Sequence, residues 1–289
     1  MTIAVTGATG TIGGLVLRNI GHRLPVRLVG RDPAVLAPLA DAYDATFAVA
    51  TYEQGGALVT AFDDVDTVFF VSGRESAHRR EEHRTVVESA HRAGVRRIVY
   101  LSFLGAAEDC TFTFGRDHHF TERDIRDSGL AFTFLRDSWY QSMLPAMVDD
   151  TGVIRGPAGE GRVGAVAPDD VAASASAVLA SADGTHDGAT YRITGPEAFT
   201  LTEAAEVLSR VTGRRIRFVD ETLDEAYASR AHYGAPAFEV DGWVTSYAAV
   251  AAGELSPVSD DVARLTGNAP IGFEDYLERH PDSWARLLL

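Results

Sequence analysis

Apolar runs alternate with amphipathic stretches along the first half of the chain. Six runs have the length and composition of buried strands, at 2–7, 26–31, 45–50, 66–73, 96–103 and 131–136. The stretches between them carry apolar residues at helical spacing, at 13–23, 33–42, 56–65, 77–93 and 119–129. Strands that alternate with helices form βαβ units. The pattern therefore predicts an α/β fold, a Rossmann-like doubly wound parallel sheet with helices on both faces.

The second half of the chain mixes short strands with more helix. The segments that carry this pattern are 163–181 (a strand entry, then a helix), 189–195 (a strand), 201–220 (a helix, a glycine stop and a strand), and 222–234 and 238–255 (amphipathic helices). We therefore predict two domains. Residues 1–149 form a nucleotide-binding domain onto which 163–195 packs back, and residues 150–289 form a smaller, mostly helical, substrate-binding lobe.

A glycine-rich turn joins the first predicted strand to the first helix. Gly7, Gly10 and Gly13 form the pattern G-x-x-G-x-x-G. In a doubly wound sheet this turn lies at the carboxyl end of the strand, where backbone N–H groups and the helix N-terminus can face a pyrophosphate. A tight turn that only packs helix against strand is the alternative. We predict a dinucleotide site whose first segment comprises Gly7, Thr9, Gly10, Thr11, Ile12 and Gly13.

The ends of the second and fourth strands predict which dinucleotide binds. An Arg after the second strand accommodates a 2′-phosphate, whereas an acidic residue accepts a hydrogen bond from a free 2′-hydroxyl. Arg31 precedes Asp32 at this position, so we predict NADPH (NADP⁺) as the cofactor; in the alternative, Asp32 contacts the ribose. Ser72 and Gly73 end the fourth strand and are predicted to lie along the ribose and diphosphate, with a helix N-cap at Ser72 as an alternative or additional role.

Amino-acid composition limits the classes of partner that we expect the protein to bind. The formal net charge is −15, which argues against nucleic acid and anionic membranes. No apolar run reaches the length of a membrane span, and we expect no signal peptide before the first strand. Cys110 is the single cysteine, so no internal disulfide can form, which fits a reducing cytoplasm. We expect a cytoplasmic protein that is a monomer or a homodimer and acts on a small molecule.

Several segments together resemble a known family. They are 5–14, 70–73, 91–102, 119–136 and 265–277, and the likeness runs from residue 2 to about 277. The chain is similar to the NmrA-like, atypical short-chain dehydrogenase/reductases, among them the type 2 NAD(P)H:quinone oxidoreductases and the triphenylmethane reductases. Segments 135–140 and 156–179 look especially like the quinone reductases. The resemblance implies the fold and an NAD(P) cofactor; the family also holds NADP-sensing proteins that do not turn over a substrate.

The chain departs from the family's patterns at several positions. The main branch of short-chain dehydrogenases uses a Tyr-x-x-x-Lys pair, and this chain has no Lys: all 26 basic residues are Arg. Ser102 occupies the strand-end position of that branch's serine, and we predict that it contacts the cofactor. Thr51 stands where many relatives carry Asp for the adenine amine, and Asp137 where the quinone reductases have Asn.

Candidate catalytic residues follow the fifth and sixth strands. His118 and Glu122 match the family's His-x-x-x-Glu, which puts both on one helix face. We predict that His118, Tyr140 and Asp137 could donate a proton; in the alternative, His118 and Glu122 are a structural pair. Metal binding by His118 and His119 is not expected, because adjacent helical residues diverge and no spaced third ligand follows.

Aromatic residues cluster at the carboxyl ends of the same strands. We place three of them in the loop after the fifth strand, and predict a wall for a flat aromatic substrate made of Phe103, Phe112, Phe114, Trp139, Tyr140, Met143 and Trp243. In the alternative, several of these are plain core. The sequence thus predicts an NADPH-dependent reductase that transfers hydride to a quinone or related aromatic acceptor. Two alternatives stay open: a non-catalytic NADP(H) sensor, and a tailoring enzyme (reductase or oxygenase) for an aromatic natural product.

Overall fold

The computed structural model describes residues 1–288 and divides into two compact units. Unit 1 comprises Met1–Phe103, Asp117–Arg136 and Val171–Tyr191. Unit 2 comprises Leu104–Arg116, Asp137–Asp170 and Arg192–Leu289. The chain therefore passes between the units several times, and the division predicted at residues 149/150 stays a proposal about domain organisation.

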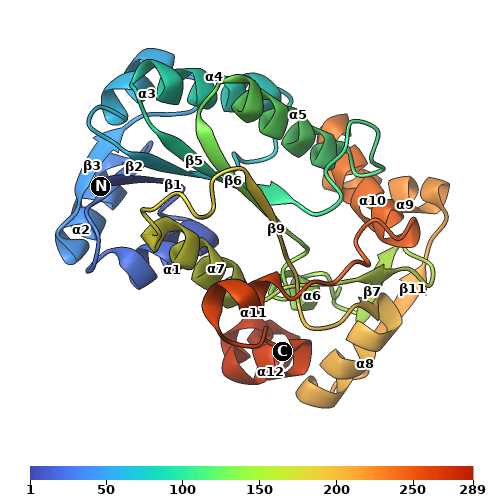
Figure 1. The fold of residues 1–289 in the computed structure, drawn as a ribbon. Coiled ribbons are helices and arrows are strands. Elements are labelled where there is room, and N and C mark those ends of the chain that lie inside the picture. Colours follow the sequence, from blue (N-terminus) through green and yellow to red (C-terminus); the bar gives the residue numbers. More distant parts are fainter. Residues whose placement is uncertain (289) are drawn as a thin grey trace. The chain divides into compact units, whose positions relative to one another are not determined.

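A seven-stranded sheet in the order β3-β2-β1-β4-β5-β6-β9 organises unit 1 (Figure 1). Its strands are β1 (Ile3–Thr6), β2 (Val26–Gly30), β3 (Thr46–Val49), β4 (Thr67–Val71), β5 (Arg97–Phe103), β6 (Ala131–Asp137) and β9 (Ala189–Ile193). Parallel pairing joins β1 to both β2 and β4, with Val5 opposite Leu28 on one side and Phe69 on the other. Because the chain winds outward in both directions from β1 and β4, the topological switch point lies between these two strands.

Helices cover both faces of this sheet, as the strand–helix alternation predicts (Figure 1). They are α1 (Thr11–Ile20), α2 (Pro33–Tyr43), α3 (Gly55–Ala61), α4 (Arg79–Arg92), α5 (Thr113–Asp127) and α7 (Pro168–Ala180). The predicted fold class and all six predicted strands are confirmed. Several boundaries differ by a few residues, and the largest difference is at α5, which begins at Thr113, six residues before the prediction. Phe114 therefore lies in the first turn of α5, and Phe103 is the last residue of β5, so neither lies in a loop.

A fully buried arginine fixes α7 to the sheet. The Arg97 guanidinium on β5 donates to the carbonyl oxygens of Val178 at 2.8 Å and Ser181 at 3.4 Å. The last carbonyls of a helix have no partners within the helix, and Arg97 supplies donors to them. Asp187 lies 3.5 Å from the same guanidinium and compensates its charge. Segment 171–191 is thereby held within unit 1.

Unit 2 combines helices with two small two-stranded sheets. Its elements are α6 (Met143–Ala146), β7 (Val153–Gly156), β8 (Arg162–Val163), β10 (Phe199–Thr200), α8 (Leu201–Thr212), β11 (Arg217–Asp220), α9 (Leu223–Arg230), η1 (Ala231–Tyr233), α10 (Ala237–Ala251), α11 (Asp261–Thr266), α12 (Phe273–Arg279), η2 (Pro281–Ser283) and η3 (Ala285–Leu288). Thr200 and Glu203 form a capping box at the start of α8. Gly213 ends α8 with φ +68°, the left-handed conformation that glycine adopts without strain, as its predicted stop role requires.

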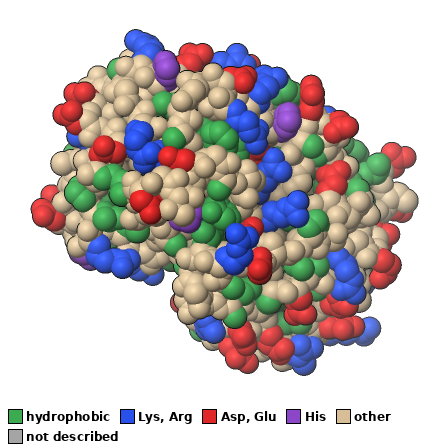
Figure 2. All heavy atoms as spheres, viewed as in Figure 1, with side chains coloured by type: hydrophobic (Ala, Val, Ile, Leu, Met, Phe, Trp, Pro, Cys, Tyr) green, Lys and Arg blue, Asp and Glu red, His purple; other side chains and the backbone are tan. Residues whose placement is uncertain are grey.

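The surface carries both signs of charge. Figure 2 shows one face, on which basic, acidic and apolar side chains lie interspersed. Among residues 1–288, no helix has the length and apolarity that crossing a membrane needs. The same residues contain no group of three His, Cys, Asp or Glu side chains that could hold a metal ion.

Candidate cofactor site

The glycine turn between β1 and α1 has the geometry that a dinucleotide site needs. Gly7 has φ +64°, and a Cβ there would lie 3.1 Å from the Cβ of Val71 at the end of β4. Gly10 donates its N–H to the Gly7 carbonyl at 2.9 Å and precedes α1 without a side-chain cap. A Cβ on Gly13 would lie 2.2 Å from the Gly7 oxygen. The glycines let α1 approach the turn closely, and they leave its positive N-terminus without a capping side chain.

A cavity of about 180 Å³ adjoins this turn at the end of β2; it is lined by Gly7, Ala8, Thr9, Val29, Gly30, Arg31, Asp32, Val35 and Leu36. Asp32 caps α2, and its carboxylate accepts from the Ala34 N–H at 2.9 Å. Arg31 is exposed. Both Arg31 and Asp32 line the cavity, so the predicted contact of Arg31 with a ribose phosphate stays a prediction.

The loop after β4 abuts the same turn through Val71. Ser72 and Gly73 are half-buried, and Gly73 is fixed by side chains of α4. Its N–H donates to His83 Nε2 at 2.8 Å, and its carbonyl accepts from Arg79 Nε at 3.1 Å. The N-cap of α4 is His78, so the alternative helix-cap role for Ser72 is wrong. The chain runs on beyond Ser72 for several residues before the helix begins.

Sequence reasoning missed Arg79 and His83. Both are buried, and both lie on the side of α4 that faces the sheet. Their spacing of four residues places them on one helix face, but an Arg and a His in a charged helix ordinarily indicate a solvated surface. The signal that could have found them is their register with the apolar residues Val86, Val87 and Ala90.

A buried carboxylate links α5 to β5 and β6. Glu122 is fully buried and accepts from Ser102 Oγ at 2.7 Å, from Arg136 at 2.7 and 2.6 Å, and from Arg126 at 3.0 Å. The Glu122 carboxylate raises the pKa of the Arg136 guanidinium. Ser102 is fully buried and its hydroxyl is engaged here. Its predicted contact with the cofactor therefore stays a prediction.

The hydrogen bonds of His118 define its tautomer. Arg79 Nη2 lies 3.2 Å from His118 Nε2, and the Tyr100 hydroxyl lies 2.9 Å from Nδ1. Because Arg can only donate, Nε2 accepts, and the ring proton sits on Nδ1 facing Tyr100. His118 is 6% exposed, and burial together with the Arg79 charge holds its pKa well below 6.5. His118 and Glu122 do share one helix face. The His118 ring is neutral, and both of its nitrogens have hydrogen-bond partners, as in a structural histidine. Proton donation by His118 stays a prediction.

Two buried neutral histidines make stability depend on pH. Burial also holds the pKa of His83 well below 6.5. In the unfolded chain both rings take up protons near pH 6.5, so their contribution is fully present above that pH and is lost as pH falls. We expect the free energy of unfolding to fall by about 1 kcal/mol per pH unit for each histidine below pH 6. Urea unfolding of wild type and His118→Gln between pH 7.5 and 5 measures this, and an identical slope in the two proteins would refute it.

Asp137 and Tyr140 form a pair within unit 2. The Tyr140 hydroxyl donates to Asp137 Oδ2 at 2.5 Å. Burial and the Asp137 charge raise the pKa of Tyr140 well above its usual value of 10. Tyr140 is therefore neutral, with its proton held toward a carboxylate that is 4% exposed. Their predicted role in proton supply stays a prediction.

The residues of the predicted aromatic wall fall into two groups that differ in how deeply their side chains are buried. Trp139 and Phe114 are 4% and 5% exposed. Trp139 stands edge-on to Tyr247, with ring centroids 5.2 Å apart. Phe114 packs so tightly on Gly242 that a Cβ there would lie 2.1 Å from its ring. The remaining predicted members are half-buried or exposed: Phe103, Phe112, Tyr140, Met143 and Trp243. These have the accessible surface that a substrate contact needs, whereas Trp139 and Phe114 serve the core of unit 2.

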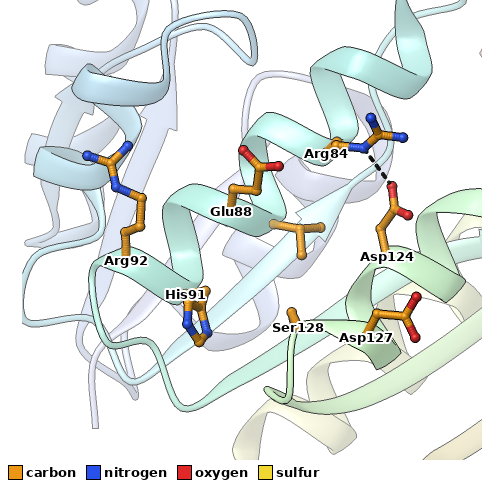
Figure 3. Close-up of a pocket in the computed structure, with 8 residues that line it drawn as sticks. Arg84, Glu88, His91, Arg92, Asp124, Asp127 and Ser128 are labelled. Carbon is orange, nitrogen blue, oxygen red and sulfur yellow. Dashed lines mark hydrogen bonds and ion pairs between the residues drawn. The ribbon is translucent and has the colours of Figure 1, made fainter.

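A larger hollow of about 540 Å³ lies between α4 and α5 (Figure 3). Its lining is Arg84, Val87, Glu88, His91, Arg92, Asp124, Asp127 and Ser128, with Arg84 donating to Asp124 at 3.3 Å. It is an open groove between the helices, away from the carboxyl ends of β1 and β2. No residue of the glycine turn lines this groove, whereas Gly7 lines the smaller cavity, so the smaller cavity is the candidate cofactor site.

Comparison with known proteins agrees with this site. A family model described as NAD(P)H-binding matches residues 7–182. The chain belongs to this NAD(P)H-binding family. It is 33% identical to (4-alkanoyl-5-oxo-2,5-dihydrofuran-3-yl)methyl phosphate reductase from Streptomyces griseus, over 98% of this chain and 99% of that protein.

Two solved structures resemble the chain over nearly its whole length. The NADPH-dependent quinone oxidoreductase of Escherichia coli, complexed with NADPH, is 30% identical with a TM-score of 0.87, over 96% of this chain and 99% of that one. The triphenylmethane reductase of Citrobacter sp., complexed with NADP(H), is 29% identical with a TM-score of 0.84 and the same coverage. The family resemblance predicted from the sequence is therefore confirmed.

Proposed function

We propose that this chain is an NADPH-dependent reductase that transfers hydride to a quinone or a related aromatic acceptor. The observation that carries the proposal is the glycine turn at the β1/β4 switch point, in a chain of the NAD(P)H-binding family. Open α/β sheets bind their ligands at this point. The reductases of quinones and triphenylmethane dyes that resemble the chain support the choice of acceptor.

The residues present fit the cofactor. The backbone from Gly7 to Gly13 and the N-terminus of α1 would hold the diphosphate, and Arg31 would pair with the 2′-phosphate. When bound, NADPH supplies the hydride, so the protein needs no nucleophile. The chain's own part is to bind, orient the acceptor and exclude water.

The acceptor side of the reaction needs protons but no Tyr-Lys pair. An electron-poor quinone takes hydride readily, and its oxyanion can be protonated by solvent. The Asp137–Tyr140 pair offers a held proton at the Tyr140 hydroxyl. The absence of Lys, which rules out the pair used for alcohol oxidation, is compatible with this chemistry.

Turnover distinguishes the reductase from its alternatives. Purified protein is mixed with NADPH and a panel of quinones, triphenylmethane and azo dyes, with a no-acceptor control. Acceptor-dependent NADPH consumption supports the proposal. Tight NADPH binding without turnover of any acceptor points instead to a sensor. Because the chain is similar to a (4-alkanoyl-5-oxo-2,5-dihydrofuran-3-yl)methyl phosphate reductase, compounds of that class are added to the panel.

Arg31→Ala should abolish the preference for NADPH over NADH. A charge-assisted bond to phosphate contributes about 1.5–3 kcal/mol, which corresponds to roughly 10- to 150-fold in affinity. Calorimetric titration of both cofactors measures the change. Asp32→Ser is the matched control, because Ser retains the cap of α2. Equal affinities of wild type for the two cofactors would rule out the NADPH assignment, and weaker NADH binding by Asp32→Ser would favour Asp32 as the ribose ligand.

We also propose that the protein acts in the cytoplasm as a monomer or a homodimer, without a nucleic-acid or membrane partner. The net charge of −15 and the single cysteine support this. Light scattering after size exclusion determines the oligomeric state.

A further inference from the structure

The Gly73 peptide is held from both sides by α4. His83 accepts its N–H at 2.8 Å, and Arg79 donates to its carbonyl at 3.1 Å. Two residues earlier, at the end of β4, the Val71 carbonyl accepts from the Tyr52 hydroxyl at 2.7 Å. The backbone of this loop is therefore anchored to side chains of the protein interior.

Each of the two α4 side chains is itself held by α5. Because the Gly73 N–H donates to His83 Nε2, the His83 proton sits on Nδ1 and points at Thr121 Oγ1, 2.8 Å away. The Thr121 hydroxyl in turn donates a hydrogen bond to the Asp117 carbonyl at 2.8 Å. Arg79 is held in turn by His118. Each orienting contact thus has a defined donor and acceptor.

These contacts are buried, so each is costly to lose. His83 is fully buried, and Thr121, Arg79 and His118 are 2%, 5% and 6% exposed. A buried polar group left without its partner loses more than an exposed one, because water does not replace the bond. The two chains of bonds, from Thr121 through His83 and from His118 through Arg79, therefore fix Gly73 in one position.

That position matters because the loop borders the glycine turn. A Cβ on Gly7 would meet Val71, two residues before Gly73. The loop therefore lies at the β1/β4 switch point, beside the backbone proposed to hold the diphosphate. We propose that Arg79 and His83 are positioning residues of the cofactor site, which hold the Ser72–Gly73 loop in the conformation that receives the cofactor. This inference rests on the proposed function.

A pair of substitutions at His83 tests the proposal. His83→Gln places an amide where Nε2 stands and keeps an acceptor for Gly73, whereas His83→Asn reaches only as far as Nδ1. Titration with NADP⁺ should show the Kd raised about tenfold in His83→Asn and within about threefold of wild type in His83→Gln. With a reduced cofactor and a quinone, KM for NADPH should rise in His83→Asn while kcat changes less.

Two further variants separate positioning from loss of stability. Val86→Ala removes core volume from the same helix without touching Gly73, and it should lower Tm without changing Kd. Gly73→Ala acts from the loop side: its Cβ would lie 3.2 Å from Tyr52 and 3.3 Å from His83, so it should weaken NADP⁺ binding with the α4 side chains unchanged. This variant gives the test if His83→Asn does not fold.

The outcomes distinguish the two proposals. Wild type that does not bind NADP⁺ overturns the proposed function. Wild type that binds, together with Gly73→Ala or His83→Asn that binds equally well, overturns the positioning role and leaves the function intact. Equal weakening by Asn, Gln and the Val86 control also overturns it, because a merely structural defect would act in that way.

Discussion

Replacing Gly13 by alanine should strongly weaken cofactor binding and lower the melting temperature. The added Cβ would lie 2.2 Å from the Gly7 oxygen, 2.6 Å from the Gly7 carbonyl carbon and 2.9 Å from the Ala8 nitrogen. All three atoms belong to the backbone, so no side-chain rotation relieves the clash. Either α1 moves off the turn or the turn changes conformation, and both displace the N–H groups proposed to face the diphosphate. We expect the Kd for NADP⁺ to rise by about 100-fold or more, since several charge-assisted bonds are lost together.

Gly14→Ala is the matched control for this substitution. Its Cβ would lie 3.3 Å from the Ala8 oxygen, a tight contact that a few tenths of an ångström relieves. Alanine also favours the helix over glycine by about 0.5–1 kcal/mol. Gly14→Ala should therefore bind NADP⁺ nearly as wild type does. Calorimetry with thermal unfolding compares the two variants, and a Gly13→Ala protein with wild-type affinity would show that close packing of α1 on the turn is dispensable.

Glu122→Ala should destabilise the protein by about 3–5 kcal/mol, the range measured when one member of a buried ion pair is removed. The substitution leaves the Arg136 guanidinium and the Ser102 hydroxyl without their acceptor. The Arg136 side chain is 24% exposed, so water compensates only part of its charge. Urea unfolding measures the loss as a shift of the midpoint at unchanged slope.

An exposed pair of the same chemistry provides the comparison. Arg210 contacts both carboxylate oxygens of Glu274, at 3.1 and 2.9 Å, and the two side chains are 57% and 47% exposed. Glu274→Ala should cost about 0.2–1 kcal/mol, because solvent screens an exposed pair. Losses of similar size at Glu122 and Glu274 would contradict the role of burial that this prediction assigns to Glu122.

The parts of the fold that depend on local pattern follow from the sequence. Strand–helix alternation and the spacing of Gly7, Gly10 and Gly13 are local features, and each predicts its structure. The start of α5 at Thr113 cannot be predicted from local sequence. Phe114 is buried there because it packs on Gly242, which lies far along the chain. Sequence pattern around residue 114 contains no trace of that partner.

The buried polar contacts of unit 1 cannot be predicted from the local sequence pattern for the same reason. The contacts of His83 with Thr121 and of Arg79 with His118 join residues 38 and 39 positions apart. An Arg or a His inside a protein is stable when its partners are present, and the sequence does not say which residues those are. The family pattern predicts His118 as a candidate acid. That its ring is neutral and hydrogen-bonded at both nitrogens follows only from the positions of Tyr100 and Arg79 in the structure.

The buried Arg97 has a consequence for how the chain is made. The guanidinium leaves the ribosome well before its carbonyl acceptors at Val178 and Ser181, and before Asp187. During synthesis an N-terminal segment that ends before residue 171 holds an arginine in the sheet whose charge nothing yet compensates, at a position that excludes water when complete. We therefore expect unit 1 to become stable late in translation. A nascent chain in which residues 1–167 have emerged should remain a substrate for chaperones and proteases until the segment 171–191 follows.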